Sequence, residues 1–215
     1  MKNKNHIFFD LDGTLIDSSI GIYEAYKQAL LILDFVKKPV SIKIFENNIG
    51  PPFEIMIKNL HPELDTSNSF EVVKNFRKIY DSKLFLKYNL YDNIKYCLRE
   101  LRRKDFFLYI LTNKRDLQAK IIVNKEFPNT FKAVYGKVGE DFNKGHILHN
   151  FRMNNNDCNI MFVGDTQSDF SASKESGVDF IYASYGFGKI NNGNKINICH
   201  QSKFLKEKIL SYFKN

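Results

Sequence analysis

Apolar residues follow two different patterns along this chain, and the change between them divides it into parts. Residues 7–9 form a short apolar run that a glycine turn soon follows, which is typical of a buried strand in a parallel sheet. From Asp17 to about Asn89, apolar residues recur at helical spacing without a convincing strand. From about Leu90, strand-length apolar runs alternate with helical stretches. This predicts an α/β fold with a doubly wound, parallel, Rossmann-like sheet and an inserted helical domain.

Several helix signals lie in the inserted segment. Polar residues 17–19 offer N-caps for a first helix, and Ser41 begins a short second one. Residues 50–52 break the chain before a third helix, and Asn68 with Glu71 resembles a capping box that opens a fourth. We interpret the apolar stripes of these helices as core; they comprise Ile22, Tyr26, Ala29, Leu30, Leu33, Phe53, Met56, Ile57, Leu60, Phe70, Val73 and Tyr80.

The remaining segment supplies the rest of the predicted sheet. Strands are expected at residues 106–111, 133–135 and 159–163. Helices are expected at about 94–101 and 116–125, from Lys144, up to Gly177, and at about 202–213. The predicted domains are therefore residues 1–16 with 90–215, and residues 17–89.

Composition and charge exclude several classes of protein. No segment approaches the ~20 apolar residues that span a bilayer, and the first residues lead straight into a strand, so we expect no signal peptide and no membrane partner. Three widely separated cysteines (Cys97, Cys158 and Cys199) favour reduced thiols in a cytoplasmic protein. The net charge of +8 comes from lysines spread along the chain, which argues against nucleic-acid binding but would attract anionic small molecules. The oligomeric state stays open.

Candidate catalytic groups follow the predicted strands. Asp10 and Asp12 come directly after the first strand, and Asp165 and Asp169 follow the strand at 159–163. Thr112 ends the strand at 106–111. In open parallel α/β sheets, ligands bind at the carboxyl edge of the strands. Paired carboxylates there can supply a nucleophile and a general acid or base, or oxygen ligands for Mg²⁺.

These residues resemble the motifs of the haloacid dehalogenase-like superfamily. The run Asp10-Leu11-Asp12-Gly13-Thr14-Leu15 is similar to its motif I, D-x-D-G-T-L, and residues 164–169 are similar to its motif IV, G-D-x-x-x-D. Thr112 with Asn113 matches motif II, which binds phosphate in the family. The resemblance covers nearly the whole chain, with a helical cap inserted after motif I.

The resemblance implies roles for the acidic residues. Asp10 would attack phosphorus to form an aspartyl-phosphate, and Asp12 would protonate the leaving alkoxide and later activate water. Family members that displace halide typically lack the second aspartate, so Asp12 favours an oxygen leaving group. Mg²⁺ would be bound by the Asp10 carboxylate, the Asp12 backbone carbonyl and Asp165, with Asp169 binding through water or orienting Asp165. Which of Asp165 and Asp169 is the primary ligand stays open.

Motif III is a single lysine, and Lys132, Lys137 and Lys144 all lie in the right stretch. We assign it to Lys144, which opens a predicted helix at the distance before motif IV that family members show. A positive charge there would offset repulsion between nucleophile and phosphate. Lys114, directly after motif II, is a candidate for substrate binding.

The chain is most similar to the phosphoglycolate phosphatase-like group. Further similarities to a branch often described as 5′-nucleotidase-like are Ile49-Gly50-Pro51-Pro52, Tyr80, Lys114 and Tyr185-Gly186-Phe187-Gly188. We regard Gly50, Pro51 and Pro52 as candidate substrate contacts. Tyr91-Asp92-Asn93 departs from the Tyr-Pro-Gly that is common where the chain returns from the cap.

The implied function is a Mg²⁺-dependent phosphatase. Its partner would be a small phosphorylated metabolite: a phosphoglycolate-like acid or a nucleoside monophosphate. Two alternatives share the core motifs or the ligand: a phosphosugar mutase of the β-phosphoglucomutase kind, and a protein that binds a phosphate ligand for regulation.

Overall fold

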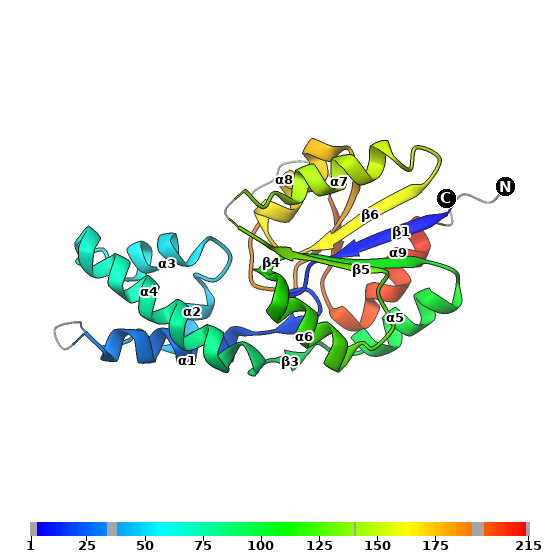
Figure 1. The fold of residues 1–215 in the computed structure, drawn as a ribbon. Coiled ribbons are helices and arrows are strands. Elements are labelled where there is room, and N and C mark those ends of the chain that lie inside the picture. The colour runs from blue at the N-terminus through cyan, green and yellow to red at the C-terminus, as the bar shows by residue number, and fades with distance from the viewer. Residues whose placement is uncertain (1–3, 34–37, 140, 191–195, 214–215) are drawn as a thin grey trace. The chain divides into compact units, whose positions relative to one another are not determined.

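A computed structural model describes residues 4–33, 38–139, 141–190 and 196–213. The chain divides into two compact units (Figure 1). One comprises Met1–Ile16 and Leu90–Asn215, and the other comprises Asp17–Asn89. We describe each unit by itself, and call the first the core unit and the second the helical unit.

The core unit is built on a six-stranded sheet in the order β5-β4-β1-β6-β7-β8, in which every neighbouring pair is parallel. This confirms the predicted α/β class. The first strand of the chain lies inside the sheet because Ile7, Phe8 and Phe9 make it apolar on both faces. The strands are β1 (Asn5–Phe9), β4 (Phe107–Arg115), β5 (Ala133–Lys137), β6 (Asn159–Gly164), β7 (Asp179–Ala183) and β8 (Asn197–Cys199).

Helices cover both faces of this sheet (Figure 1). The helices α5 (Ile94–Arg103), α6 (Asp116–Glu126) and α9 (Leu205–Tyr212) lie on one face. The helices α7 (Lys144–Met153) and α8 (Gln167–Ser176) lie on the other. The chain steps outward from β1 to β4 and β5, then crosses to the other side of β1 for β6, β7 and β8. Because parallel strands need right-handed crossovers, this reversal puts the two sets of helices on opposite faces.

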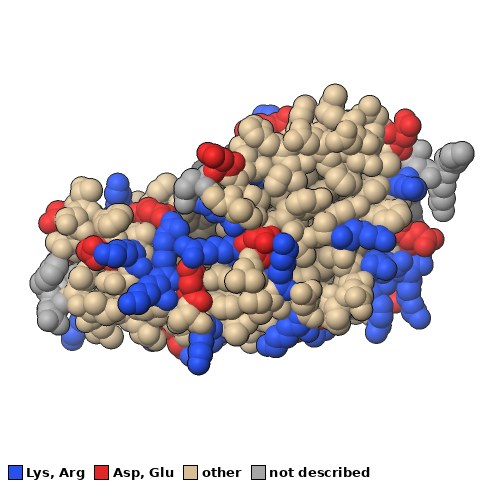
Figure 2. Space-filling model, in the orientation of Figure 1, with Lys and Arg blue, Asp and Glu red and all other residues tan. Residues whose placement is uncertain are grey.

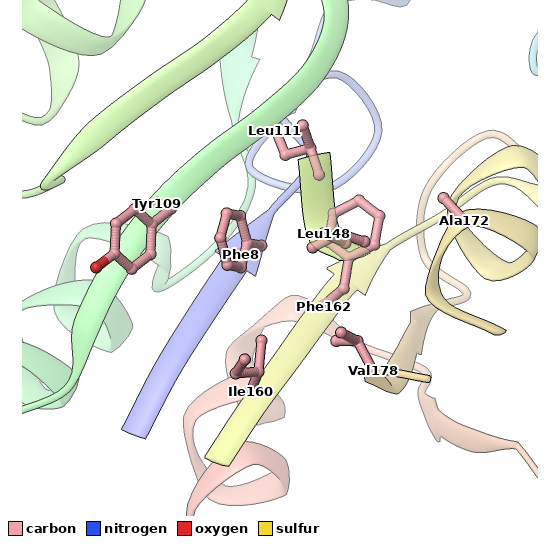
Figure 3. Close-up of a cluster of buried hydrophobic side chains, with 8 residues drawn as sticks. All are labelled: Phe8, Tyr109, Leu111, Leu148, Ile160, Phe162, Ala172 and Val178. Carbon is pink, nitrogen blue, oxygen red and sulfur yellow. The ribbon is translucent and has the colours of Figure 1, made fainter. Parts of the chain in front are cut away.

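A cluster of buried side chains joins α7 and α8 to the sheet (Figure 3). Phe8 from β1 stacks on Tyr109 from β4, with ring centroids 4.7 Å apart. Leu148 and Ala172 contribute from the two helices. Such close packing fixes the ends of β1 and β6, where the acidic residues begin.

The helical unit contains the α-helices α1 (Ser19–Leu31), α2 (Ile42–Glu46), α3 (Phe53–Leu60) and α4 (Thr66–Ser82) and the 3₁₀ helix η1 (Leu84–Leu86). Its core forms where α1 and α3 pack on α4. Tyr26, Phe45 and Ile57 are fully buried there, and the Phe53 ring stacks on Phe76.

Three expectations for this unit were wrong. The fourth helix begins at Thr66, because the Asp65 side chain accepts a hydrogen bond from the Asn68 backbone N–H and acts as the N-cap in place of a box of Asn68 with Glu71. Phe70 is 64% exposed, although we assigned it to the core. Leu33 lies beyond the end of α1.

Two short strands that the sequence pattern did not predict lie where the chain passes between the units. β2 (Ile16–Asp17) and β3 (Asn89–Leu90) form a two-stranded sheet. Just after β3, Asn93 takes the left-handed conformation with φ 60°. Asn tolerates that conformation better than most residues, so Asn93 can adopt it here without being glycine.

Lys and Arg side chains are spread over the face shown in Figure 2, with Asp and Glu among them. Within the part of the chain that the structure describes, no helix has both the length and the apolar character needed to cross a membrane.

We expect His6 to make the stability of the protein depend on pH. Its ring stacks between aromatic side chains, its Nδ1 lies 3.1 Å from the Tyr109 hydroxyl, and burial, with help from Lys4, lowers its pKa. The unfolded chain therefore binds a proton below about pH 6.5 that the native state resists, so this residue reduces stability as the pH falls. We expect His6→Phe to lose less free energy of unfolding than the wild type between pH 7.5 and 5.5, measured by urea denaturation.

The comparison must be made with the wild type over the same range, because other buried groups also titrate there. His149→Gln, on the exposed surface of α7, is the matched control. Equal pH dependence in all three proteins would contradict the role of His6.

Candidate active site

Asp10 begins the site at the carboxyl end of β1. Its backbone N–H donates to the Val163 carbonyl at 2.9 Å, which continues the pairing of β1 with β6. Its side chain is buried, and its Oδ1 accepts a hydrogen bond from the Leu11 backbone N–H at 2.7 Å. One carboxylate oxygen is thus held by the backbone, which orients the other.

The turn after Asp10 brings the chain against Asp165. Gly13 has φ +77°, and a Cβ atom at this position would lie 2.1 Å from Asp165 Oδ2. Only glycine allows both this backbone conformation and this close approach. The next residue, Thr14, donates its hydroxyl to Asp165 Oδ1 at 3.2 Å. The turn after Asp10 is therefore packed directly against Asp165.

The two acids that follow β6 are held by different partners. Asp165 Oδ2 accepts from the backbone N–H groups of Phe187 at 2.9 Å and Gly188 at 3.3 Å. Asp169 Oδ2 accepts from the Thr166 backbone N–H at 3.0 Å and the Thr166 hydroxyl at 2.7 Å, in the capping box that opens α8. Both carboxylates are fully buried.

Lys144, the first residue of α7, reaches into this cluster. Its Nζ lies 2.6 Å from Asp169 Oδ1 and 3.2 Å from Asp10 Oδ2. Its side chain is buried. Lys132, in contrast, is exposed, and its ammonium lies over the Phe107 ring. Among the candidates for the motif III lysine, Lys144 therefore contacts the acidic side chains directly.

Burial and mutual repulsion raise the pKa values of two of the buried carboxyl groups, Asp10 and Asp165. Burial raises the pKa of Asp10 to about 7; Lys144 opposes this rise, whereas the charges of Asp169 and Asp12 add to it. Burial, followed by the charges of Asp169 and Asp10, also raises the pKa of Asp165. Burial alone would lower the pKa of Lys144, but the two neighbouring carboxylates outweigh it and raise that pKa. Burial and repulsion between the carboxylates therefore favour the neutral forms of Asp10 and Asp165 in the metal-free site.

Residues 112–114 continue β4, which runs to Arg115 rather than ending at Leu111. Thr112 is buried, and a hydrogen bond from its side chain lowers the pKa of Asp10. Asn113 is exposed. Lys114 is buried, with its Nζ 3.0 Å from Asp12 Oδ1. The structure thus places Lys114 against the second acid of the first motif.

Comparison with known protein families agrees with this geometry. Residues 7–183 match the family described as haloacid dehalogenase-like hydrolase. The chain belongs to this family.

Curated relatives of this hydrolase are similar over most of its length. It is 29% identical over 190 residues to a 5′-nucleotidase of Pseudomonas aeruginosa, which covers 85% of this chain and 84% of the relative. It is also 29% identical over 195 residues to a phosphoglycolate phosphatase of Aquifex aeolicus, covering 86% and 87%. With the family match, these relatives indicate a phosphoric monoester hydrolase of the phosphoglycolate phosphatase-like group.

A solved structure has the same fold. A haloacid dehalogenase-like family hydrolase from Streptococcus pneumoniae superimposes on this chain with a TM-score of 0.82 at 29% sequence identity. The match covers 99% of this chain and 100% of that one.

The carboxylates of this hydrolase fit a divalent cation. Asp10, Asp165 and Asp169 each offer an oxygen atom, and these atoms lie within 4.8 Å of one another. When all three are ionised, their three negative charges meet one ammonium from Lys144, so the cluster keeps a net charge of −2. Oxygen donors and this charge are what a hard divalent cation requires.

Gly50, Pro51 and Pro52 lie in the helical unit, directly before α3. Pro51 and Pro52 are exposed, and the Pro52 carbonyl accepts hydrogen bonds from the backbone N–H groups of Ile55 and Met56. Pro52 therefore caps the start of α3, and this structural role is separate from any contact with substrate.

Sequence reasoning assigned no role to several residues that contact the acidic cluster. Thr14 and Thr166 donate hydroxyl groups to Asp165 and Asp169. The backbone at Phe187 and Gly188 holds Asp165. The two glycines in Tyr185-Gly186-Phe187-Gly188, directly after a strand, are the signal that could have indicated a close backbone approach.

Proposed function

We propose that this chain is a Mg²⁺-dependent phosphatase that hydrolyses small phosphomonoesters through an aspartyl-phosphate on Asp10. The observation that carries this proposal is the contact of Lys144 with both Asp10 and Asp169 beside Asp165. A nucleophile, a positive charge and a set of oxygen ligands thus meet at one edge of the sheet, where ligands of open α/β sheets bind. The relatives named as phosphatase and nucleotidase support the same reaction.

The chemistry would proceed in two steps. An Asp10 oxygen attacks phosphorus, the bond to the ester oxygen breaks, and Asp12 gives its proton to the departing alkoxide. Asp12 then takes a proton from water, which attacks phosphorus and releases inorganic phosphate and Asp10. Thr112 and Asn113 would bind the phosphate oxygens, and Lys144 would offset the charge between the carboxylate and the phosphate.

Mg²⁺ would be held by the Asp10 carboxylate, the Asp12 backbone carbonyl and Asp165, and would supply positive charge to the phosphate. Asp169 has both oxygens engaged, one by Lys144 and the other by Thr166. Among the residues that the structure describes, Asp165 Oδ1 accepts one hydrogen bond, the longer one from Thr14, at 3.2 Å. This favours Asp165 as the direct ligand and Asp169 as the residue that orients Lys144.

The names of the relatives support the proposed substrate class. A phosphoglycolate-like acid or a nucleoside monophosphate is the proposed substrate, and Gly50, Pro51 and Pro52 are candidates to contact its leaving group. An assay of phosphorylated metabolites with Mg²⁺ tests this: release of phosphate from one of these two classes supports the proposal. A requirement for a sugar bisphosphate would point to a mutase, and binding without turnover would point to a regulatory protein.

Lys144 should be essential for turnover. We expect Lys144→Met to lower kcat by about 10²–10³-fold, because it removes the positive charge that Asp10 and Asp169 share. Steady-state kinetics with p-nitrophenyl phosphate measures the effect. Lys132→Met removes an exposed lysine and is the matched control, for which we expect wild-type rates. Equal losses in the two variants would contradict the assignment.

Lys114 should affect leaving-group protonation, because its ammonium lies 3.0 Å from Asp12 Oδ1 and orients that carboxyl. We expect Lys114→Met to lower kcat for alkyl phosphates about tenfold or more, and to change kcat for p-nitrophenyl phosphate little, since p-nitrophenolate leaves without a proton. Rates across leaving groups of different pKa measure this. Lys120→Met on α6 is the control. A uniform rise in KM would instead show that Lys114 binds substrate.

A further inference from the structure

Tyr185 contacts the chain segments next to both passages between the units. Its hydroxyl donates to the Thr14 carbonyl at 2.8 Å, two residues before β2. Its ring lies edge-on to Tyr91, with centroids 4.9 Å apart, and Tyr91 directly follows β3. The Tyr91 backbone N–H in turn donates to the Leu15 carbonyl at 3.3 Å. One side chain thus touches the segment that leaves the core unit and the segment that returns to it.

The loop that carries Tyr185 also holds Asp165. Two and three residues later, Phe187 and Gly188 donate their backbone N–H groups to Asp165 Oδ2. The Tyr182 hydroxyl donates to the Gly188 carbonyl at 2.7 Å, which ties the loop to β7.

The same loop packs closely on the first motif. A Cβ atom at Gly186 would lie 2.2 Å from the Gly13 carbonyl oxygen and 2.5 Å from Asp165 Cβ. The loop therefore has no room to shift without displacing either the first turn or Asp165.

We infer that Tyr185 is a positioning residue for Asp165, which fixes this carboxylate relative to the two segments that connect the units. The inference rests on the proposed function, since it gives Asp165 the role of a Mg²⁺ ligand. The hydrogen bond from Tyr185 to Thr14 and the two from the loop to Asp165 form one continuous chain of contacts. Loss of the first contact frees the loop, and the Asp165 carboxylate loses its fixed orientation.

Tyr185→Phe tests this, because it removes the hydroxyl and keeps the ring against Tyr91. We expect its dissociation constant for Mg²⁺, measured by calorimetry, to rise about threefold to tenfold, as the loss of one hydrogen bond allows. At saturating Mg²⁺, kcat should recover. Amide hydrogen exchange at Phe187, Gly188 and Tyr91 should be faster than in the wild type.

Tyr109→Phe is the matched control, because it also removes a phenol hydroxyl that has a hydrogen bond, here with His6. We expect unchanged Mg²⁺ binding and unchanged exchange at the loop in this variant. Tyr91→Leu is a second test, because it removes the other ring of the contact with Tyr185. Amide hydrogen exchange at Phe187 should also be faster in this variant. Exchange and Mg²⁺ affinity at wild-type levels in Tyr185→Phe would overturn the inference.

The exchange measurement separates this inference from the proposed function. If the wild type neither binds Mg²⁺ nor hydrolyses phosphomonoesters, the proposed function fails. Faster exchange at Phe187 and Gly188 in Tyr185→Phe would still support the role of Tyr185 in holding the Asp165 loop, and unchanged exchange would reject it.

Discussion

Asp10→Asn should abolish turnover while the protein stays folded. The amide has nearly the shape of the carboxylate and keeps an oxygen that can accept from the Leu11 N–H, but it cannot attack phosphorus. We expect kcat to fall by more than about 10⁴-fold, as the loss of a covalent nucleophile does in other enzymes. Phosphate release from p-nitrophenyl phosphate at saturating Mg²⁺ measures the loss.

Stability distinguishes a catalytic role for Asp10 from a structural one. The buried carboxylates repel one another, and burial already raises the pKa of Asp10 to about 7. Removing one of these charges should therefore leave the free energy of unfolding of the metal-free protein unchanged or higher. Asp92→Asn, at an exposed turn, is the matched control and should keep full activity. Turnover near the wild-type level in Asp10→Asn would reject the mechanism.

The sheet could be predicted because its inner strands are apolar on both faces. β1, β4 and β6 appear in the sequence as dense apolar runs, and the acids that follow them could be assigned to one edge. β8 was not predicted, because its three residues carry too little pattern. β2 and β3 have only two residues each, and they are defined by their pairing with each other.

The helical unit shows where periodicity misleads. Phe70 occupies a helical stripe position in the sequence, yet it is exposed because α1 and α3 pack on other parts of α4. Asp65 and Asn68 are both good capping residues, and only the local backbone decides which of them caps the helix. Propensity and spacing predict that a helix exists better than they predict where it starts.

The site shows a further limit. Sequence motifs pointed to Asp10, Asp165 and Lys144, whose mutual contacts the structure provides. Two contacts join residues that are more than a hundred positions apart. They are the ion pair of Lys114 with Asp12 and the hydrogen bond from Tyr185 to the Thr14 carbonyl. No local pattern carries such information, because it arises only when the strands are placed in order.

Removal of divalent metal should silence the enzyme, and Mg²⁺ should restore it. With all three carboxyl groups ionised, the cluster of Asp10, Asp165, Asp169 and Lys144 would carry a net charge of −2, which a bound cation would balance, and carboxylate oxygens suit Mg²⁺. We expect no detectable turnover with EDTA and full recovery with excess Mg²⁺. Ca²⁺ should bind and inhibit, because its looser coordination lets Asp10 bind through both oxygens and leaves none free to attack.

Metal binding should also depend on pH in a direction that the pKa of Asp10 fixes. That pKa is raised to about 7 in the metal-free site, so below pH 7 a proton must leave Asp10 before the cation binds. The dissociation constant for Mg²⁺ should therefore rise as the pH falls from 8 to 6, and the increase in Tm that Mg²⁺ produces should shrink over the same range. Asp10→Asn has no such proton to lose, so its weaker Mg²⁺ binding should vary less with pH. Full activity in EDTA, or a Tm that Mg²⁺ leaves unchanged at pH 8, would reject a metal site formed by these carboxylates.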